Sequence, residues 1–330
     1  ERVAILSSLI LLTGEVFVIY SMKLSTDILF SLFIFLGVWT WLTSRHPELL
    51  SGSQKTPRSK LYVLSGLFFG LASMTKGLSA VPFLMALFIS LLFNFKKERL
   101  FAFIKLCLVY AAIIIPWHLV AYLTYGNHFI KVYIEDNIIK RSTYPIEFHR
   151  ERIWFYFVLL YKDLSPWLFV AVILPIQALL SFSRKRESRT GSPIKLGMTL
   201  MASFKKNELV FTLLLLILLP LISITRVQTR IAWYALPIYP FLAIYLAYSI
   251  NLFLEFVSKK RPSILNTLYF ILILCISLDA FRLILTETKF NNPKQTLDPR
   301  QEVALQVVKQ QGGTLNYLVA YGERGAKVIL

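Results

Sequence analysis

Long apolar blocks dominate this chain and restrict what it can fold into. One of them, "LVFTLLLLILLPLISI" (Leu209–Ile224), contains no charged residue. A helix needs about 20 predominantly apolar residues to cross a bilayer. Only 16% of the residues are charged and 56% are hydrophobic, whereas about 25% of a soluble domain is charged. The sequence therefore predicts an all-α, multi-pass transmembrane bundle.

The apolar blocks predict nine spans within a membrane region of residues 1–282. They are Val3–Tyr20, Thr26–Thr43, Leu61–Thr75, Ala80–Phe93, Phe101–Leu123, Pro166–Phe182, Leu209–Ile224, Ala232–Leu252 and Ser263–Arg282. The third and fourth are short and separated only by "KGLS". The alternative for this pair is a tight helical hairpin.

The basic residues predict the orientation of the spans. The loops at 44–60, 94–100, 183–207 and 258–262 carry 17 Lys or Arg. The alternate loops at 21–25, 76–79, 124–165 and 225–231 carry 10 over a nearly equal length. Cytoplasmic loops are enriched in Lys and Arg, so we expect the first set to be cytoplasmic and the second exoplasmic.

Composition also excludes some classes of protein. The net charge of +18 lies in short gaps between apolar blocks and not in a nucleic-acid-binding module, so we expect no nucleic acid partner. Cys107 and Cys275 lie in separate apolar runs, which argues against a disulfide framework. We interpret the basic segment 183–207 as a solvated cytoplasmic insertion.

The character of the chain changes again after Arg282. Residues 283–330 contain a helical pattern from Gln301 to Gln310, a Gly-Gly stop and the strand-like "LNYLVAY". They predict the start of a small soluble α/β domain, placed outside by the odd number of spans. Because the chain begins without Met and ends within a strand-like segment, we expect a longer protein.

Several polar residues fall on the predicted exoplasmic side. Asp27 opens the second span, Lys76 ends the third, and "YIEDNIIKRST" follows the fifth. Each has an ordinary explanation, since Asp caps helix N-termini and Lys extends from the membrane toward water. Their location at one face favours a shared site.

These segments carry a resemblance to a known family. "STDILFSLF", "GLASMTKGLSAVPF", "PWHLVAYLTYGNHFIKVYIEDNIIKRST", "DLSPW" and "WYALPIYPFLAIYLA" occur in this order. They are similar to the lipid-linked-sugar glycosyltransferases of the GT-C fold, in the branch of aminoarabinose transferases and bacterial protein O-mannosyltransferases. The similarity covers about Leu6 to Leu252 and is interrupted by the basic insertion.

The resemblance implies a sugar donor linked to polyprenyl phosphate, in the inner (plasma) membrane of a bacterium, with transfer on the periplasmic or exterior side. Lys76 and Arg141 are candidates to bind the donor phosphate, because developing negative charge needs fixed cations. Asp27 and Asp136 are the candidate catalytic acids, and Asn137 is a candidate contact to a sugar hydroxyl.

Trp117, Tyr234 and Tyr239 are candidate sugar or lipid contacts, although single aromatic residues at such positions more often pack or mark the membrane interface. The resemblance leaves room for a divalent metal ion. His128 and His149 lack the spacing of a metal site.

One departure from the family pattern concerns its principal catalytic acid, which lies in the first exoplasmic loop. The alignment places this loop upstream of residue 1, so we expect the given chain to be inactive alone. The acceptor, whether lipid A, a protein or a surface glycan, is left open. The rival readings are a transporter or flippase of lipid-linked substrates, which would place charges at mid-membrane, and a non-catalytic scaffold.

The predicted topology can be tested by labelling single cysteines on intact cells with an impermeant thiol reagent. We expect Ser142→Cys to be labelled and Ser188→Cys to be protected, because the basic asymmetry places their loops on opposite sides. The reverse pattern would overturn both the topology and the location of the site.

Overall fold

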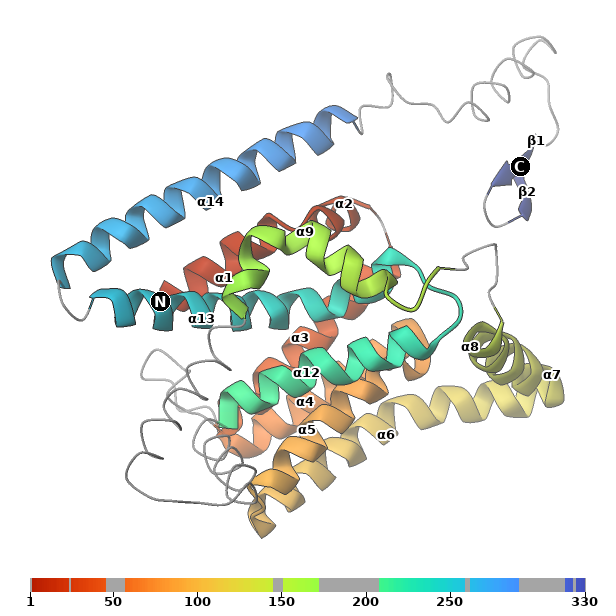
Figure 1. The fold of residues 1–330 in the computed structure, drawn as a ribbon. Coiled ribbons are helices and arrows are strands. Elements are labelled where there is room, and N and C mark those ends of the chain that lie inside the picture. Colours follow the sequence, from red (N-terminus) through yellow and green to blue (C-terminus); the bar gives the residue numbers. More distant parts are fainter. Residues whose placement is uncertain are drawn as a thin grey trace, which may run out of the picture.

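The computed structural model describes residues 2–23, 25–45, 57–144, 151–171, 208–258, 262–290, 318–322 and 325–329. Within these ranges the chain is helical apart from one β-hairpin (Figure 1). The N-terminal elements are α1 (Arg2–Leu12), α2 (Glu15–Ser21), α3 (Thr26–Arg45), α4 (Arg58–Lys76), the 3-10 helix η2 (Gly77–Ala80), α5 (Val81–Phe93) and α6 (Lys97–Tyr125).

The remaining elements begin just after α6. They are α7 (Asn127–Ile130), the π-helix η3 (Lys131–Lys140), α8 (Arg141–Thr143), α9 (Phe155–Ala171), α12 (Glu208–Arg226), the 3-10 helix η4 (Ala232–Ile238), α13 (Tyr239–Ser258), α14 (Pro262–Phe290), β1 (Leu318–Gly322) and β2 (Gly325–Ile329).

The described helices identify an integral membrane protein but give fewer spans than the nine predicted. Five stretches are long and apolar enough to cross a membrane, and the bent pair α1 and α2 would make six. The five are Thr26–Arg45, Arg58–Phe93, Lys97–Tyr125, Glu208–Arg226 and Ala232–Leu252. The sixth predicted span, Pro166–Phe182, lies mostly outside the described residues, and the ninth lies in α14, whose side chains are described only in part.

The first predicted span, Val3–Tyr20, is broken into two helices that meet at 79°. Gly14 between them has an extended backbone, and the Thr13 hydroxyl donates a hydrogen bond back to the Ile10 carbonyl oxygen at 2.7 Å. Asp163 of α9 accepts a hydrogen bond from the Val16 backbone N–H at 3.3 Å. A carboxylate from another helix therefore satisfies a free donor at the start of α2.

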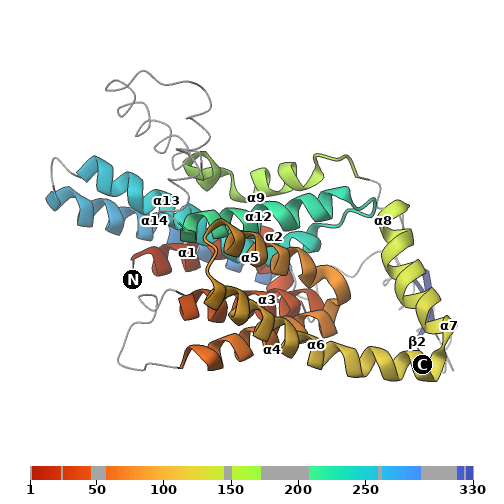
Figure 2. The ribbon, with the colours of Figure 1, turned by 90° about the horizontal axis from the view of Figure 1, so that it is seen from below.

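The stretch Arg58–Phe93 contains the two short predicted spans, and it reverses direction at η2. At the end of α4, Lys76 contacts Asp27 at the start of α3. After α5, Asn94 contacts Glu208, which pairs with Arg45 at the end of α3. The chain therefore returns along α3 between these two contacts. The two helices pack against different neighbours, because α4 lies against α3 and α6 while α5 lies against α12 (Figure 2).

Close packing of α4 against α6 depends on two glycines. A Cβ atom at Gly66 would lie 2.5 Å from the Leu106 carbonyl oxygen, and one at Gly70 would lie 2.7 Å from Ile113 Cδ1. Small residues at a helix interface allow two backbones to approach closely in a membrane. This approach carries the end of α4 toward the last turns of α6, where the candidate site lies.

The predicted exoplasmic connection at 124–165 is helical over much of its described part, a detail that the sequence analysis does not specify. After Gly126 the chain continues as α7, η3 and α8, a helical segment that lies across the end of α6 (Figure 2). The Ser142 carbonyl oxygen accepts a hydrogen bond from the Gln228 N–H at 3.2 Å, so the segment is joined to the turn after α12. The helix α9 begins at Phe155, eleven residues before the predicted span.

The C-terminal domain stays a prediction, because most of residues 283–330 lie outside the described part of the chain, including the helix expected at 301–310. The helix α14 continues past the predicted boundary at residue 282 to Phe290. The strands β1 and β2 form an antiparallel hairpin in the expected strand region. The basic insertion at 183–207 is also outside the described residues.

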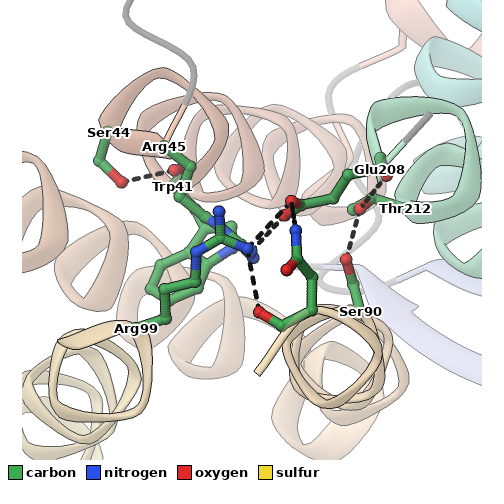
Figure 3. Close-up of polar contacts among 8 residues, drawn as sticks. Trp41, Ser44, Arg45, Ser90, Arg99, Glu208 and Thr212 are labelled. Atoms are coloured by element: carbon green, nitrogen blue, oxygen red, sulfur yellow. Dashed lines mark hydrogen bonds and ion pairs between the residues drawn. The ribbon is translucent and has the colours of Figure 1, made fainter. Parts of the chain in front are cut away.

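A polar cluster joins four helices at the end of the bundle opposite Lys76 (Figure 3). Arg45 of α3 and Arg99 of α6 both pair with Glu208, the first residue of α12. The Asn94 side-chain amide donates to the same carboxylate at 2.8 Å. The side chains of Arg45 and Glu208 are only 3% and 11% exposed. The Glu208 carboxylate therefore neutralises the buried positive charge of Arg45.

We predict that Glu208→Gln lowers the melting temperature of the purified protein strongly. Removing one partner of a buried ion pair leaves an uncompensated charge and costs about 3–5 kcal/mol. The matched control is Glu98→Gln, at the exposed start of α6 near the same end of the bundle. Equal melting temperatures for the two variants would contradict a stabilising role for the cluster.

Candidate functional site

The site is built around an ion pair between Asp27 and Lys76. Asp27 lies in the first turn of α3, and Lys76 is the last residue of α4. Their side chains are 14% and 21% exposed, and Lys76 Nζ contacts Asp27 Oδ1. Each charge lies at the helix end that it stabilises electrostatically, because acids favour N-termini and cations favour C-termini.

Aromatic side chains cover the Lys76 ammonium group. Its Nζ lies 4.6 Å from the centroid of the Tyr234 ring and 5.9 Å from that of Phe30. A cation over an aromatic face within about 6 Å is electrostatically favourable, more so where water is excluded. Besides α3 and α4, which carry Asp27 and Lys76, a third element therefore contacts the ion pair, namely η4 through Tyr234.

The ion pair borders a cavity of about 710 Å³. Side chains from α3, α4, η2, α6, η3, α8, α12 and η4 line it, so segments far apart in the sequence meet there. Four of the predicted site residues are part of the lining, namely Lys76, Trp117, Asn137 and Tyr234. The volume falls within the range of about 300–1,000 Å³ that is common for small-molecule pockets.

The cavity also contains His118 and Tyr133, which we did not select from the sequence. His118 Nδ1 lies 2.8 Å from the Ile114 carbonyl oxygen, and His118 Nε2 lies 3.0 Å from the Tyr133 hydroxyl. A carbonyl oxygen can only accept, so Nδ1 carries a proton, and in the neutral imidazole Nε2 accepts from the Tyr133 O–H. Burial raises the pKa of Tyr133, which keeps this hydroxyl protonated.

An aromatic cluster fixes η3 above the cavity. The rings of Phe129 and Tyr133 are stacked with centroids 5.2 Å apart, and Trp117 meets both rings edge-on. These contacts join the end of α6 to η3. π-Helical turns are rare and are frequently found at functional sites. The sequence hints at this cluster, because aromatic or His residues flank Gly126 in "PWHLVAY" and "FIKVY". A single His in an apolar run, however, resembles a core residue.

The side chains of Asp136 and Asn137 lie in different environments. Asp136 pairs with Lys140 one helical turn away, with both side chains well exposed, and it is absent from the lining of the cavity. The hydrogen bond from Lys140 lowers the pKa of the Asp136 carboxyl. Asn137 lines the cavity, and its side-chain amide donates to the Val132 carbonyl oxygen at 2.7 Å.

Tyr239 lies in the core and outside this cavity. It is 1% exposed, and its hydroxyl donates to Asp163 Oδ2 at 2.5 Å. Its ring also packs against Gly14, where a Cβ atom would lie 3.2 Å from Tyr239 Cε1. In this structure Tyr239 therefore joins α13 to α9 and to the break between α1 and α2.

Two predicted positions lie outside the described side chains. Arg141 begins α8, next to Ser142 in the lining of the cavity, but its side chain is outside the described part of the structure, as is all of His149. His128 lies in α7. In the described ranges no three His, Cys, Asp or Glu side chains are grouped so as to hold a metal ion.

Comparison with known proteins supports the fold. No family model matches the chain, and no curated protein matches its sequence. Among solved structures, the crystal structure of ArnT from Cupriavidus metallidurans bound to undecaprenyl phosphate matches with a TM-score of 0.54 and 14% sequence identity. The match covers 94% of this chain and 53% of ArnT. The chain thus shares the fold of about half of a GT-C aminoarabinose transferase.

We predict that Gly77→Ala lowers the melting temperature more than Gly126→Ala. Both glycines have nearly the same backbone conformation, with φ of 59° and 52° and ψ of −136° and −131°, so each alanine would be strained by about 1–2 kcal/mol. A Cβ at Gly77 would also lie 3.0 Å from the Tyr133 hydroxyl, whereas one at Gly126 meets nothing within 4 Å. Equal losses would show that the contact with Tyr133 contributes nothing.

Proposed function

We propose that the protein is a membrane glycosyltransferase that transfers a sugar from a polyprenyl-phosphate donor to an acceptor at the periplasmic or exterior face of a bacterial inner membrane. The observation that carries this proposal is the Asp27–Lys76 ion pair beneath Tyr234, at the edge of a cavity at one end of the membrane helices. The likeness of the fold to ArnT, whose structure contains undecaprenyl phosphate, supports the choice of donor.

The reaction is a substitution at the anomeric carbon of the donor sugar. The bond between this carbon and the phosphate oxygen breaks, and the released polyprenyl phosphate takes the bonding electron pair. An acceptor hydroxyl forms the new bond to the anomeric carbon and gives its proton to a base. The site must therefore stabilise negative charge on the phosphate and receive one proton.

Lys76 is suited to the leaving phosphate. An ammonium group has three N–H donors, so Lys76 can contact Asp27 and a phosphate oxygen together. Asp27 and Tyr234 fix its position, and a charge held in place before the reaction stabilises the transition state without reorganisation. Arg141, at the start of α8, is the proposed second phosphate ligand because a guanidinium binds two phosphate oxygens at once.

The other residues of the cavity have supporting roles in this proposal. Trp117 and Tyr234 offer aromatic faces to a sugar or a prenyl chain, and Asn137 offers an amide to a sugar hydroxyl. Asp27 and Asp136 stay proposed as acids of the site, with the principal acid of the reaction expected upstream of residue 1. The acceptor is a lipid such as lipid A, a protein or a surface glycan, and a divalent metal ion stays a proposed cofactor.

A transporter or flippase of lipid-linked substrates would call for charges near the middle of the membrane. In the described part of the chain, the ion pairs of Asp27 and of Glu208 lie at the ends of their helices. This arrangement favours the enzyme over the transporter.

The test is transfer in vitro from a defined polyprenyl-phosphate sugar by variants of the complete protein. We expect Lys76→Ala to lower the rate about 10- to 100-fold, since a charge-assisted contact to phosphate is worth about 1.5–3 kcal/mol. Asp27→Asn should also lower the rate, because Asp27 holds the Lys76 ammonium group in place. Lys131→Ala, in the exposed part of η3, is the matched control and should transfer normally.

Melting temperatures separate a catalytic role from a structural one. Asp27 lies in the first turn of α3, so if it acted only by stabilising the helix end, Asp27→Asn would lower the melting temperature and transfer normally. Wild-type rates in both Lys76→Ala and Asp27→Asn would refute the proposed site. Asp136→Asn tests the second acid, because an acid that only pairs with Lys140 on the surface should be replaceable without effect.

A further inference from the structure

A second cavity, of about 880 Å³, lies on the other side of α3. It is a groove with α1 and α2 along one side, α3 along the other, and Pro240, Ala243 and Ile244 of α13 at its floor. It has no lining residue in common with the cavity beside Lys76. A ligand in this groove would therefore occupy a separate site.

The wall of the groove is mainly apolar, although Ser7, Ser8 and Ser31 also line it. Leu11 and Phe17 come from the broken first helix, and Leu29, Leu32 and Phe35 come from α3. Leu29 and Leu32 are 42% and 50% exposed, so they present a hydrocarbon surface to whatever fills the groove. Because α3 is a candidate membrane span, the hydrocarbon chains of a lipid are the occupant that suits such a surface.

The mouth of the groove is polar and basic. Lys23 is the only charged residue among the described residues that line the groove. The Ser25 hydroxyl oxygen is buried and makes no hydrogen bond within the described part of the chain. Lys23 Nζ lies 4.8 Å from the centroid of the Tyr20 ring. Lys23 and Ser25 are two residues apart and line the same cavity, and an ammonium group and an unsatisfied hydroxyl are both donors suited to a phosphate oxygen.

The depth of the groove indicates the length of the ligand. Its lining on α3 runs from Ser25 to Phe35, which at 1.5 Å per residue is about 15 Å. The hydrocarbon core of a bilayer is about 30 Å thick, so the groove reaches the depth of one leaflet. A glycerophospholipid has tails of this length and a phosphate at the level of the mouth.

We infer that this groove binds an anionic glycerophospholipid of the same leaflet as the candidate active site, with its phosphate on Lys23 and Ser25 and its tails along Leu29 and Leu32. The lipid is a resident ligand and takes no part in sugar transfer. Lys23 and Ser25 immediately precede Thr26 and Asp27, so the bound lipid stabilises the connection that leads into α3.

The experiment measures lipid binding by the complete protein in detergent, independently of any transfer activity. Dioleoyl phosphatidylglycerol and dioleoyl phosphatidylcholine are titrated in parallel, and retained lipid is counted by native mass spectrometry while melting temperature is followed. We expect preferential retention of phosphatidylglycerol and a higher melting temperature with it. Lys23→Gln should weaken its binding about fivefold, the usual effect of one Lys near an anionic lipid surface.

Two matched pairs of variants make the test specific. Leu32→Trp fills the groove and should lower retention of both lipids, whereas Leu119→Trp, at an exposed apolar position of α6, should not. Lys131→Gln, an exposed lysine of η3, should bind like the wild type. Unfolding of a variant would be seen in its melting curve without lipid.

Three outcomes would overturn the inference. Equal retention of the two lipids by the wild type would show an unselective membrane-facing surface. Wild-type binding by both Lys23→Gln and Leu32→Trp would place the lipid elsewhere. Displacement of phosphatidylglycerol by undecaprenyl phosphate in simple competition would make the groove part of the donor site.

Discussion

The cost of placing charge in a bilayer is the constraint on which this structure depends. Charged side chains at the centre of a membrane are expensive, and the ion pairs that join α3 to other membrane helices lie at its two ends. Asp27 and Arg45, at the two ends of α3, pair with Lys76 of α4 and Glu208 of α12. Pairing at both ends fixes the position of α3 along the membrane normal relative to its neighbours, which hydrophobic packing alone does not specify.

The long helices could be predicted from the sequence because their apolar patterns are uninterrupted. The second, fifth, seventh and eighth predicted spans are confirmed as candidate spans, with Ala232–Leu252 at the same boundaries. The break at Gly14 could not be predicted, since both of its sides are apolar and the partner that satisfies the start of α2, Asp163, lies far along the chain. The sequence predicts that the segment at 127–143 connects two spans but does not predict that it is helical, since the aromatic contacts that hold it, such as Phe129–Tyr133, leave no periodic apolar pattern.

The site could be predicted only in part. That Asp27 and Lys76 lie at one face followed from topology, and the structure brings their side chains into contact. Tyr234 and Tyr239 were equivalent in sequence, but Tyr234 belongs to a 3-10 helix and Tyr239 begins an α-helix. This change of helix type orients Tyr234 toward Lys76 and Tyr239 toward Asp163. His118 was missed because its partner Tyr133 lies beyond the Gly126 turn, on the segment that was read as a loop.

The start of α3 connects the two cavities physically. Ser25 faces the groove and Asp27 pairs with Lys76 beside the other cavity. Ser25 immediately precedes α3 and Asp27 lies in its first turn, so one short segment contributes to both cavities. The residues that line the mouth of the groove and the residue that pairs with Lys76 therefore belong to one continuous segment, in which Ser25 and Asp27 are two positions apart.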